Sequence, residues 1–250
     1  MGLDLDEPLD YHGVQVAKGN TRAEHMPEVA TYPGEPTKSY GGDFTTINGF
    51  NAELVRRRFE ATADRLVNEM PGRVLELGPA DGGMSPMIRT VAGKGLMVWD
   101  GTAKELLKTK VYPFDVVYCM HVLEHVTGPV TFLREVRRLV KDGGIVFLSV
   151  PNAYSLHRIL GVELGVIATA KTLGPRDHAA GHRAVYDIVD LEKVTTQAGF
   201  ATVERLPVLA KPFPDRMMED CTGRMLDNLA VLAQANNVFD SQLLLMLECA

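Results

Sequence analysis

The chain has 250 residues, of which 46% are hydrophobic and 23% are charged, and its formal net charge is −6 at pH 7. This composition is typical of a globular protein and excludes the disordered and fibrous classes. Because a net negative charge gives no general attraction to nucleic acid or to anionic lipid, we expect a small-molecule or protein partner, with no nucleic acid and no membrane. The sequence leaves the oligomeric state open, a homodimer included.

The cysteines and the N-terminal residues indicate a cellular compartment. Cys119, Cys221 and Cys249 are widely separated and form no CxxC pair, so we expect neither a disulfide framework nor a zinc site. The first thirty residues are acidic where a secretory signal would be basic and then apolar, and no apolar run reaches membrane-spanning length. These features predict a cytoplasmic protein.

The chain divides into an N-terminal arm and one domain. Residues 1–47 are rich in proline and glycine and predict an irregular arm, whose Tyr40 and Phe44 are candidates for a lid. The domain, 48–250, opens with an amphipathic helix from Asn51 to about Met70.

Strand-like runs then alternate with helical stretches, a pattern typical of an α/β protein with a doubly wound, Rossmann-like and mostly parallel sheet. The predicted strands span 73–77, 95–99, 114–120, 145–150, 201–206 and 242–249, and helices are predicted at 130–140, 191–198 and about 215–236.

The first strand ends in a glycine-rich turn, Glu76-Leu77-Gly78-Pro79-Ala80-Asp81-Gly82-Gly83. Glycines at such a turn let a ligand press against the backbone where a Cβ would obstruct it. The spacing is not the GxGxxG of a dinucleotide site, and a carboxylate at Glu76 would repel pyrophosphate but attract a cationic ammonium group. The turn favours a cofactor such as S-adenosylmethionine, although an ordinary glycine turn remains the alternative.

A second acid, Asp100, ends the next strand, where a carboxylate can accept both hydroxyl protons of a ribose. The alternative is an exposed loop acid, or a cap for the helix that follows.

Four ordered segments resemble the motifs of class I S-adenosylmethionine-dependent methyltransferases, in particular the small-molecule branch of ubiquinone-biosynthesis and sugar methyltransferases. They span 74–83, 98–102, 114–126 and 139–144. The resemblance implies a sheet whose last strand is antiparallel. It also implies that the methionine part of the cofactor contacts Glu76, Gly78, Ala80 and Gly82, that the ribose contacts Asp100, Gly101 and Thr102, and that the sulfonium region faces Cys119, Met120 and His121.

The sequence departs from the family between Asp100 and Phe114. Only Ala103 to Pro113 lies there, so the third, edge strand and its adenine-binding acid are expected to be missing. Either Leu106, Leu107 or Tyr112 then closes the adenine side by apolar contact, or the cofactor binds poorly and the protein has drifted from catalysis.

Polar side chains gather after the fourth predicted strand, in an acceptor-binding insertion at about 152–187. Its candidate acceptor-binding residues are Asn152, His157, Arg158, Arg183 and Tyr186. His178 and His182 are the candidate catalytic bases, since a neutral imidazole can take the proton of a hydroxyl acceptor. With Asp177 they are also conceivable metal ligands, but Gly181 argues against a regular helix there and we predict no metal. Glu124 and His125 are expected only to cap and solvate a helix.

The sequence therefore predicts methyl transfer from S-adenosylmethionine to a polar small molecule, with a sugar or glycan hydroxyl as the first candidate. The alternatives are N-methylation and a non-catalytic, methyltransferase-like protein that binds or regulates a partner.

Overall fold

The computed structural model describes residues 50–69, 72–79 and 84–250. The predicted arm at 1–47, with Tyr40 and Phe44, lies outside these residues, as do Ala80 and Gly82 of the glycine-rich turn. In the part of the chain that is described, no helix is both long enough and apolar enough to cross a membrane.

The described residues form one six-stranded sheet in the order β2-β1-β3-β4-β6-β5. β1 pairs in parallel with β2 and β3, β3 pairs in parallel with β4, and β6 runs antiparallel to both β4 and β5. The mostly parallel sheet with an antiparallel last strand is confirmed. The strands are β1 Val74–Leu77, β2 Leu96–Trp99, β3 Phe114–Met120, β4 Val140–Pro151, β5 Phe200–Arg205 and β6 Gln242–Cys249.

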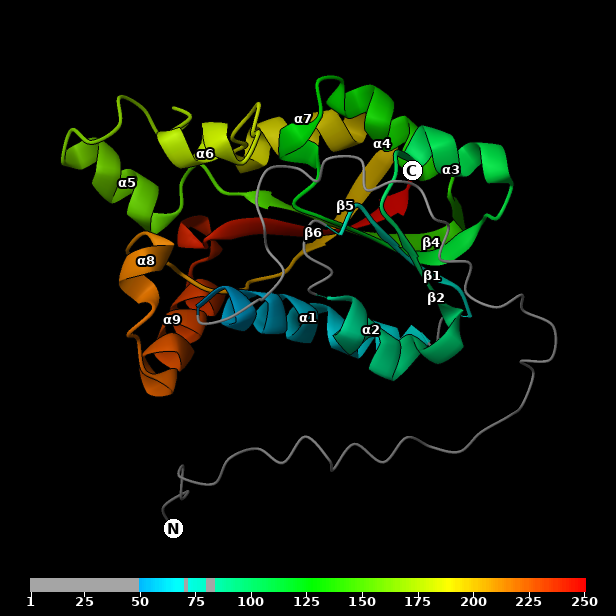
Figure 1. Cartoon of the computed structure of the whole chain (residues 1–250), viewed down its shortest axis with the longest axis horizontal. Helices are drawn as coiled ribbons and strands as arrows, with labels where there is room; N and C mark the ends of the chain where they lie inside the picture. The colour runs from blue at the N-terminus through cyan, green and yellow to red at the C-terminus, as the bar shows by residue number, and fades with distance from the viewer. Residues whose placement is uncertain (1–49, 70–71, 80–83) are drawn as a thin grey trace, which may run out of the picture. The chain divides into compact units, whose positions relative to one another are not determined.

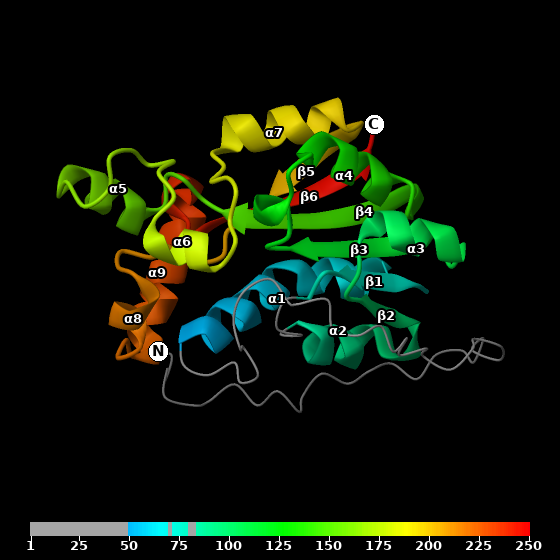
Figure 2. The same ribbon diagram turned by 45° about the horizontal axis from the view of Figure 1, so that its top comes forward.

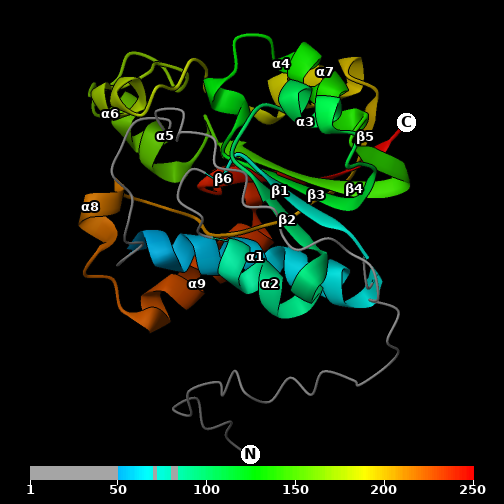
Figure 3. The same cartoon turned by 45° about the vertical axis from the view of Figure 1, so that its right-hand side comes forward.

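Helices cover both faces of the sheet, as expected for a parallel sheet that is buried on both sides. Figures 1 and 3 show α3, α4 and α7 on one face and α1, α2 and α9 on the other. Figure 2 shows α5 and α6 beyond the arrowheads of β3 and β4, at the carboxyl ends of the parallel strands. The helices are α1 Phe50–Glu69, α2 Ser85–Ala92, α3 Ala103–Thr109, α4 Pro129–Arg137, α5 Leu156–Glu163, α6 Pro175–Ala179, α7 Ile188–Gln197, α8 Asp215–Met218 and α9 Gly223–Ala235, with 3₁₀ turns at Gly93–Gly95, Leu123–His125 and Asn237–Phe239.

Each face of the sheet has its own hydrophobic core. One core joins residues such as Leu106 of α3 and Leu133 of α4 to the sheet, and the other joins Leu66 of α1 and Ile88 of α2 to it. Each of these side chains is fully buried, and burial of a leucine-sized side chain contributes roughly 1.5–3 kcal/mol. The central strands are therefore held on both sides, which fixes the strand ends that carry the site.

The third strand of the family is absent from the described residues, as the sequence predicts. β2 leads directly into α3, which crosses back over β1 and delivers the chain to β3. α3 can begin immediately after β2 because Thr102 caps it: its hydroxyl accepts from the Glu105 amide at 3.2 Å, and the Glu105 carboxylate accepts from the Thr102 amide at 3.0 Å.

Several predicted boundaries are shifted. The helix predicted at 191–198 begins at Ile188 and the helix predicted at 130–140 ends at Arg137, while the two larger differences concern α8–α9 and β4. The helix expected at 215–236 is divided into α8 and α9, because Thr222 starts a new helix by accepting a hydrogen bond from the Met225 amide at 3.4 Å. β4 begins at Val140 rather than at Ile145, since the chain pairs with Phe114 before the register shifts at a bulge.

Candidate active site

The glycine-rich turn begins with a buried acid and a left-handed glycine. Glu76 is 4% exposed at the end of β1, and the Ser85 hydroxyl donates to its carboxylate. Gly78 has φ +65° and donates its amide to the Trp99 carbonyl at 2.8 Å. A Cβ at Gly78 would lie 3.0 Å from Cγ2 of Val122, so the backbone passes very close to the end of β3. A carboxylate and a bare backbone at a strand end fit the ammonium-bearing part of S-adenosylmethionine.

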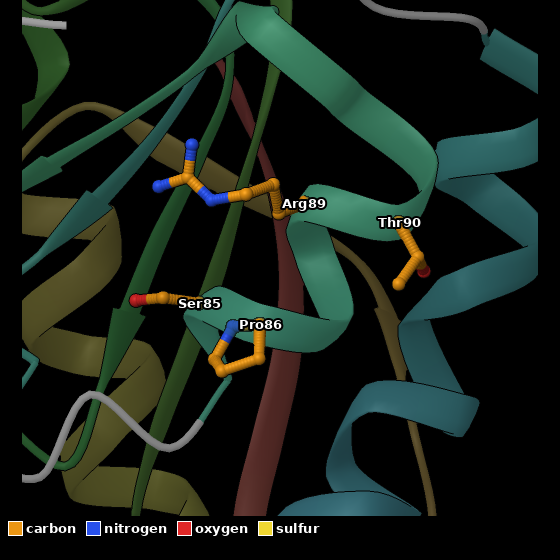
Figure 4. Close-up of a pocket in the computed structure, with 4 residues that line it drawn as sticks. All are labelled: Ser85, Pro86, Arg89 and Thr90. Atoms are coloured by element: carbon orange, nitrogen blue, oxygen red, sulfur yellow. The ribbon is translucent and has the colours of Figure 1, made fainter.

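A shallow depression lies on the surface of α2. It is lined by Ser85, Pro86, Arg89 and Thr90, and in the view of Figure 4 the side chains of Ser85 and Arg89 extend to the same side of the helix. Because Ser85 also contacts Glu76, the depression adjoins the end of β1.

The predicted ribose residues lie together at the end of β2. Asp100 is exposed, and the neighbouring protein surface desolvates its carboxylate in part, which raises its pKa above the ordinary value. A Cβ at Gly101 would lie 2.7 Å from Trp99 Nε1, so the close approach requires glycine. The Thr102 hydroxyl donates to Glu105 at 2.9 Å in addition to its capping bond, so this side chain is committed to α3. Of the three residues, Asp100 is the one with an exposed carboxylate available to a ribose.

The two leucines of α3 offer little surface to a ligand. Leu106 is 0% exposed and Leu107 is 9% exposed, and both side chains pack into the hydrophobic core. Tyr112 is only partly buried against the same core, so it is the one of the three candidates that keeps some exposed surface.

The three predicted sulfonium-facing residues at the end of β3 differ in exposure. Cys119 is fully buried in the core, and burial raises the pKa of its thiol. Met120 is 8% exposed, whereas the side chain of His121 is 31% exposed. His121 has φ +55°, and its Nε2 lies 2.7 Å from Oε1 of Gln242. The structure therefore presents mainly His121 at this edge.

A polar cluster lies next to His121 and joins segments far apart in the chain. Glu124, His125 and His182 each place one carboxylate oxygen or ring nitrogen within 4.8 Å of the others. The His125 and His182 rings meet edge to face, with centroids 4.8 Å apart. We call these three residues the Glu124 cluster.

The segment that carries His182 is hydrogen-bonded to the 3₁₀ turn after β3, and the His182 ring contacts Asp177 of α6. The Arg183 amide donates to the Glu124 carbonyl at 2.7 Å, and His182 Nδ1 lies 3.1 Å from Asp177 Oδ1. Partial burial acts to raise the pKa of Asp177, but His182, the Gly174 amide and Arg158 outweigh it and hold the pKa below its ordinary range. Asp177 is thus a carboxylate that orients the His182 ring.

The two candidate bases are not equivalent. His182 is half-buried, in contact with Asp177 and part of the Glu124 cluster, whereas His178 is exposed on α6 and lies outside that cluster. The predicted break at Gly181 is confirmed, since this glycine has φ +78° after the end of α6. The geometry favours His182.

The expectation that Glu124 only caps and solvates a helix is wrong. Glu124 is 0% exposed in a 3₁₀ turn, and its carboxylate faces the His121 ring, with Nδ1 3.2 Å from Oε1. Burial lowers the pKa of His125, and the nearby Glu124 carboxylate opposes this effect only in part. The one signal in the sequence was the spacing His121-x-x-Glu124-His125, because His182 joins the group only in the folded chain.

Two predicted acceptor-binding residues have structural contacts instead. Asn152 is 2% exposed; its Nδ2 donates to the Val238 carbonyl at 2.9 Å and to the Asp240 carbonyl at 2.8 Å. Arg158 donates to the carbonyls of Ala170, at 2.8 Å, and of Thr172. These contacts indicate that both side chains hold the insertion in place.

The other three predicted acceptor-binding residues differ in environment. His157 is half-buried, and burial, together with nearby Lys211 and Arg158, lowers its pKa to about 3. Tyr186 is 6% exposed, and burial raises the pKa of its phenol to about 12. Arg183 is exposed beside the Glu124 cluster. At neutral pH the insertion thus offers a neutral imidazole, a neutral phenol and a cation.

The sequence of the chain is similar to that of known methyltransferases. A family model described as a methyltransferase domain matches residues 48–205. The ubiquinone biosynthesis O-methyltransferase of Pseudomonas paraeruginosa is 32% identical over 119 residues, which are 46% of this chain and 47% of that protein. The corresponding protein of Caulobacter vibrioides is 38% identical over 77 residues, 31% of this chain and 30% of its own length. The chain thus matches at most about half the length of these relatives.

A solved structure gives a likeness of fold alone. The cyclopropane-fatty-acyl-phospholipid synthase-like protein of Lactobacillus casei has a TM-score of 0.50 and 13% identity, and the match covers 79% of this chain and 91% of that one.

Proposed function

Since the chain belongs to the methyltransferase-domain family, within the class I S-adenosylmethionine-dependent methyltransferases, we propose that it methylates a hydroxyl group of a polar small molecule. The observation that carries the proposal is that the candidate cofactor-binding turn and the candidate acceptor-binding cluster lie next to each other. The Gly78 turn, which suits the cofactor, packs against Val122, and two members of the Glu124 cluster, Glu124 and His125, follow Val122 within three residues. A methyl donor and a polar acceptor would therefore meet at the carboxyl ends of β1 and β3.

S-adenosylmethionine, the cofactor of this family, supplies an electrophilic methyl group whose bonding electrons remain with sulfur. Glu76 would bind its ammonium group, and Asp100 would accept hydrogen bonds from its ribose. Gly78 would let the cofactor lie against the backbone, where an alanine Cβ would shift Val122. Such residues act mainly by aligning the reacting groups and by excluding water.

A hydroxyl acceptor must lose its proton when the new oxygen–carbon bond forms. His182 is the better placed of the two candidate bases, since Asp177 orients its ring through Nδ1 and leaves Nε2 for the acceptor side. Oxygen as the acceptor atom is supported by the matched relatives, which are named O-methyltransferases. A sugar or glycan hydroxyl is the first candidate, because His157, Arg183 and Tyr186 offer polar groups that suit a polyol.

The two rival functions make different demands on the site. An N-methyltransferase would need less assistance with proton removal, so substitution of His182 would have little effect on turnover. A non-catalytic binding protein would need no cofactor, and the missing edge strand motivates this alternative.

The first experiment measures S-adenosylhomocysteine binding to the full chain by isothermal titration calorimetry. We expect the wild-type chain to bind S-adenosylhomocysteine and Asp100→Ala to abolish this binding. The matched control is Asp142→Ala, at an exposed aspartate of β4, which should leave the binding intact. Labelled S-adenosylmethionine is then offered with a panel of sugars, phenols and amines. Wild-type protein that binds no S-adenosylhomocysteine at millimolar concentration would favour the binding-protein alternative, and methylation of amines alone would favour N-methylation.

A further inference from the structure

The 3₁₀ turn after β3 contains a buried carboxylate that few neighbouring groups compensate. Glu124 is 0% exposed, and neither of its oxygens has a hydrogen-bond partner among the described residues. The His121 ring lies at ion-pair distance, 3.2 Å, without the geometry of a hydrogen bond. Burial of an ionised carboxylate is costly unless a cation or hydrogen bonds compensate for the lost water. A compensating cation is therefore expected at this point.

Two imidazoles stand beside this carboxylate. His125 follows Glu124 directly, and His182 comes from the segment after α6, with all three ligand atoms within 4.8 Å of one another. In a tetrahedral zinc site with bonds near 2.0–2.1 Å, neighbouring ligand atoms are roughly 3.3 Å apart. Adjustments of about one ångström in side-chain position would bring these atoms to that spacing.

The surroundings of His182 match those of a metal-binding histidine. Asp177 Oδ1 lies 3.1 Å from Nδ1 and fixes the ring, which leaves Nε2 as the free ligand atom. Asp177 is itself held by the Gly174 amide at 2.8 Å and by Arg158 at 3.4 Å. A carboxylate on the second nitrogen is the usual partner of a histidine that binds a metal, because it fixes the ring orientation and raises the basicity of the ligand.

We propose that Glu124, His125 and His182 bind a divalent transition-metal cation, with Zn²⁺ as the best match, and leave one coordination position for the acceptor hydroxyl. Two imidazoles and one carboxylate form a ligand set that suits Zn²⁺ better than Mg²⁺, which prefers oxygen ligands. Three protein ligands with an open fourth position are typical of catalytic rather than structural zinc sites.

The catalytic role of this cation rests on the proposed function, whereas its binding does not. A hydroxyl bound to the cation loses its proton more readily, as a metal-bound water does. The proton passes to water, and the oxygen keeps the electron pair with which it takes up the methyl group. His182 is then a metal ligand, and the cation replaces a free imidazole as the group that promotes deprotonation.

The test is titration of the full, untagged and chelator-treated chain with Zn²⁺, Mn²⁺ and Mg²⁺ by isothermal titration calorimetry. We expect one site per chain that binds Zn²⁺ more tightly than Mg²⁺. Glu124→Gln and His182→Gln should each weaken Zn²⁺ binding by more than about 100-fold, and Asp177→Asn, which changes only the orienting carboxylate, by about 10- to 100-fold. Glu163→Gln and His178→Gln are matched controls at exposed positions and should leave the Kd unchanged.

Thermal unfolding shows whether each variant is folded, so that a loss of Zn²⁺ binding is not confused with a loss of structure. Without metal, Glu124→Gln should melt no lower than wild type, because it removes a buried charge while keeping the shape of the side chain. Zn²⁺ should raise the Tm of wild type and of the two controls but not that of Glu124→Gln. A Zn²⁺ response that survives both Glu124→Gln and His182→Gln would overturn the proposal, as would a wild-type chain that binds none of the three cations at 1 mM.

Failure of the metal site can be distinguished from failure of the proposed function. Methyl transfer that persists in the chelator-treated chain, with no Zn²⁺ bound, would overturn the metal site and leave the methyltransferase intact. Zn²⁺ binding that depends on Glu124, in a chain that does not bind S-adenosylhomocysteine, would support the metal site and contradict the proposed function.

Discussion

The substitution Gly78→Ala tests whether the close approach of the turn to β3 matters for stability and for cofactor binding. Two costs follow from the structure. An L-residue in the left-handed region, at φ +65°, costs about 1–2 kcal/mol relative to glycine. The new Cβ would also lie 3.0 Å from Val122 Cγ2, and crowding of a packed side chain adds roughly 1–2 kcal/mol. We therefore expect a loss of about 2–4 kcal/mol in the free energy of unfolding.

Gly143→Ala is the matched control for this change. Gly143 has φ +71°, but its added Cβ would meet nothing within 4 Å, so only the backbone cost of about 1–2 kcal/mol applies. Because a domain of this size loses about 2–4 °C in Tm per kcal/mol, thermal unfolding should resolve the two variants. Gly78→Ala should also weaken S-adenosylhomocysteine binding at least about tenfold, equivalent to 1.4 kcal/mol, while Gly143→Ala leaves it unchanged. Equal losses of Tm and unchanged binding in both variants would refute this reasoning.

Three further predictions concern residues that hold the strand ends in place. In Asp115→Asn an NH₂ group replaces one of the two carboxylate oxygens that accept from Lys141 and, at 2.7 Å, from the Arg73 amide, so only one of these contacts can remain, and the change should cost about 1–2 kcal/mol in urea unfolding. Partial burial acts to raise the pKa of Asp115, but these partners outweigh it and hold the pKa below its ordinary value. The stabilisation by this carboxylate is therefore present at neutral pH and is lost as pH falls through the folded-state pKa. The free energies of unfolding of wild type and Asp115→Asn should thus converge in acid, and a constant difference between them down to pH 2 would contradict this. Asn152→Ala removes the side-chain donor to the buried Asp240 carbonyl and to the part-buried Val238 carbonyl, and should cost about 1–3 kcal/mol, measured as a lower urea midpoint; a midpoint close to wild type would show that the two bonds contribute little. Thr102→Ala removes the cap of α3 and should cost about 1 kcal/mol, whereas Thr102→Ser should retain most of that stability; equal losses would count against the hydroxyl cap.

The sequence predicted the fold well where hydrophobic runs were bounded by clear turns. β3 and β6 begin and end at the predicted residues, and the missing edge strand followed from the short path between Asp100 and Phe114. The start of β4 was missed because Lys141-Asp142-Gly143-Gly144 has the composition of a hairpin turn, yet it continues the strand through a bulge. Local composition does not show that a bulge will be paired.

The site was predicted less completely because polar residues serve two purposes. Asn152 and Arg158 lie where an acceptor would be expected, but their side chains donate to backbone carbonyls, those of Val238 and Asp240 before β6 for Asn152 and those of the insertion for Arg158. Glu124 seemed a helix cap, but the folded chain brings it next to His182, more than fifty residues later in the sequence. A polar side chain in a sequence does not reveal whether its partner is the backbone, another side chain or a ligand.

The position of β2 explains how a methyltransferase sheet can lose a strand without losing its ligand crevice. β2 is the outermost described strand on its side, and β1 and β3 remain neighbours in the interior of the sheet. A strand removed from the margin leaves no gap between the strands that remain, whereas loss of an internal strand would separate β1 from β3. The missing strand therefore changes the edge of the sheet beside β2 but not the pairing of β1 with β3, whose carboxyl ends carry the site.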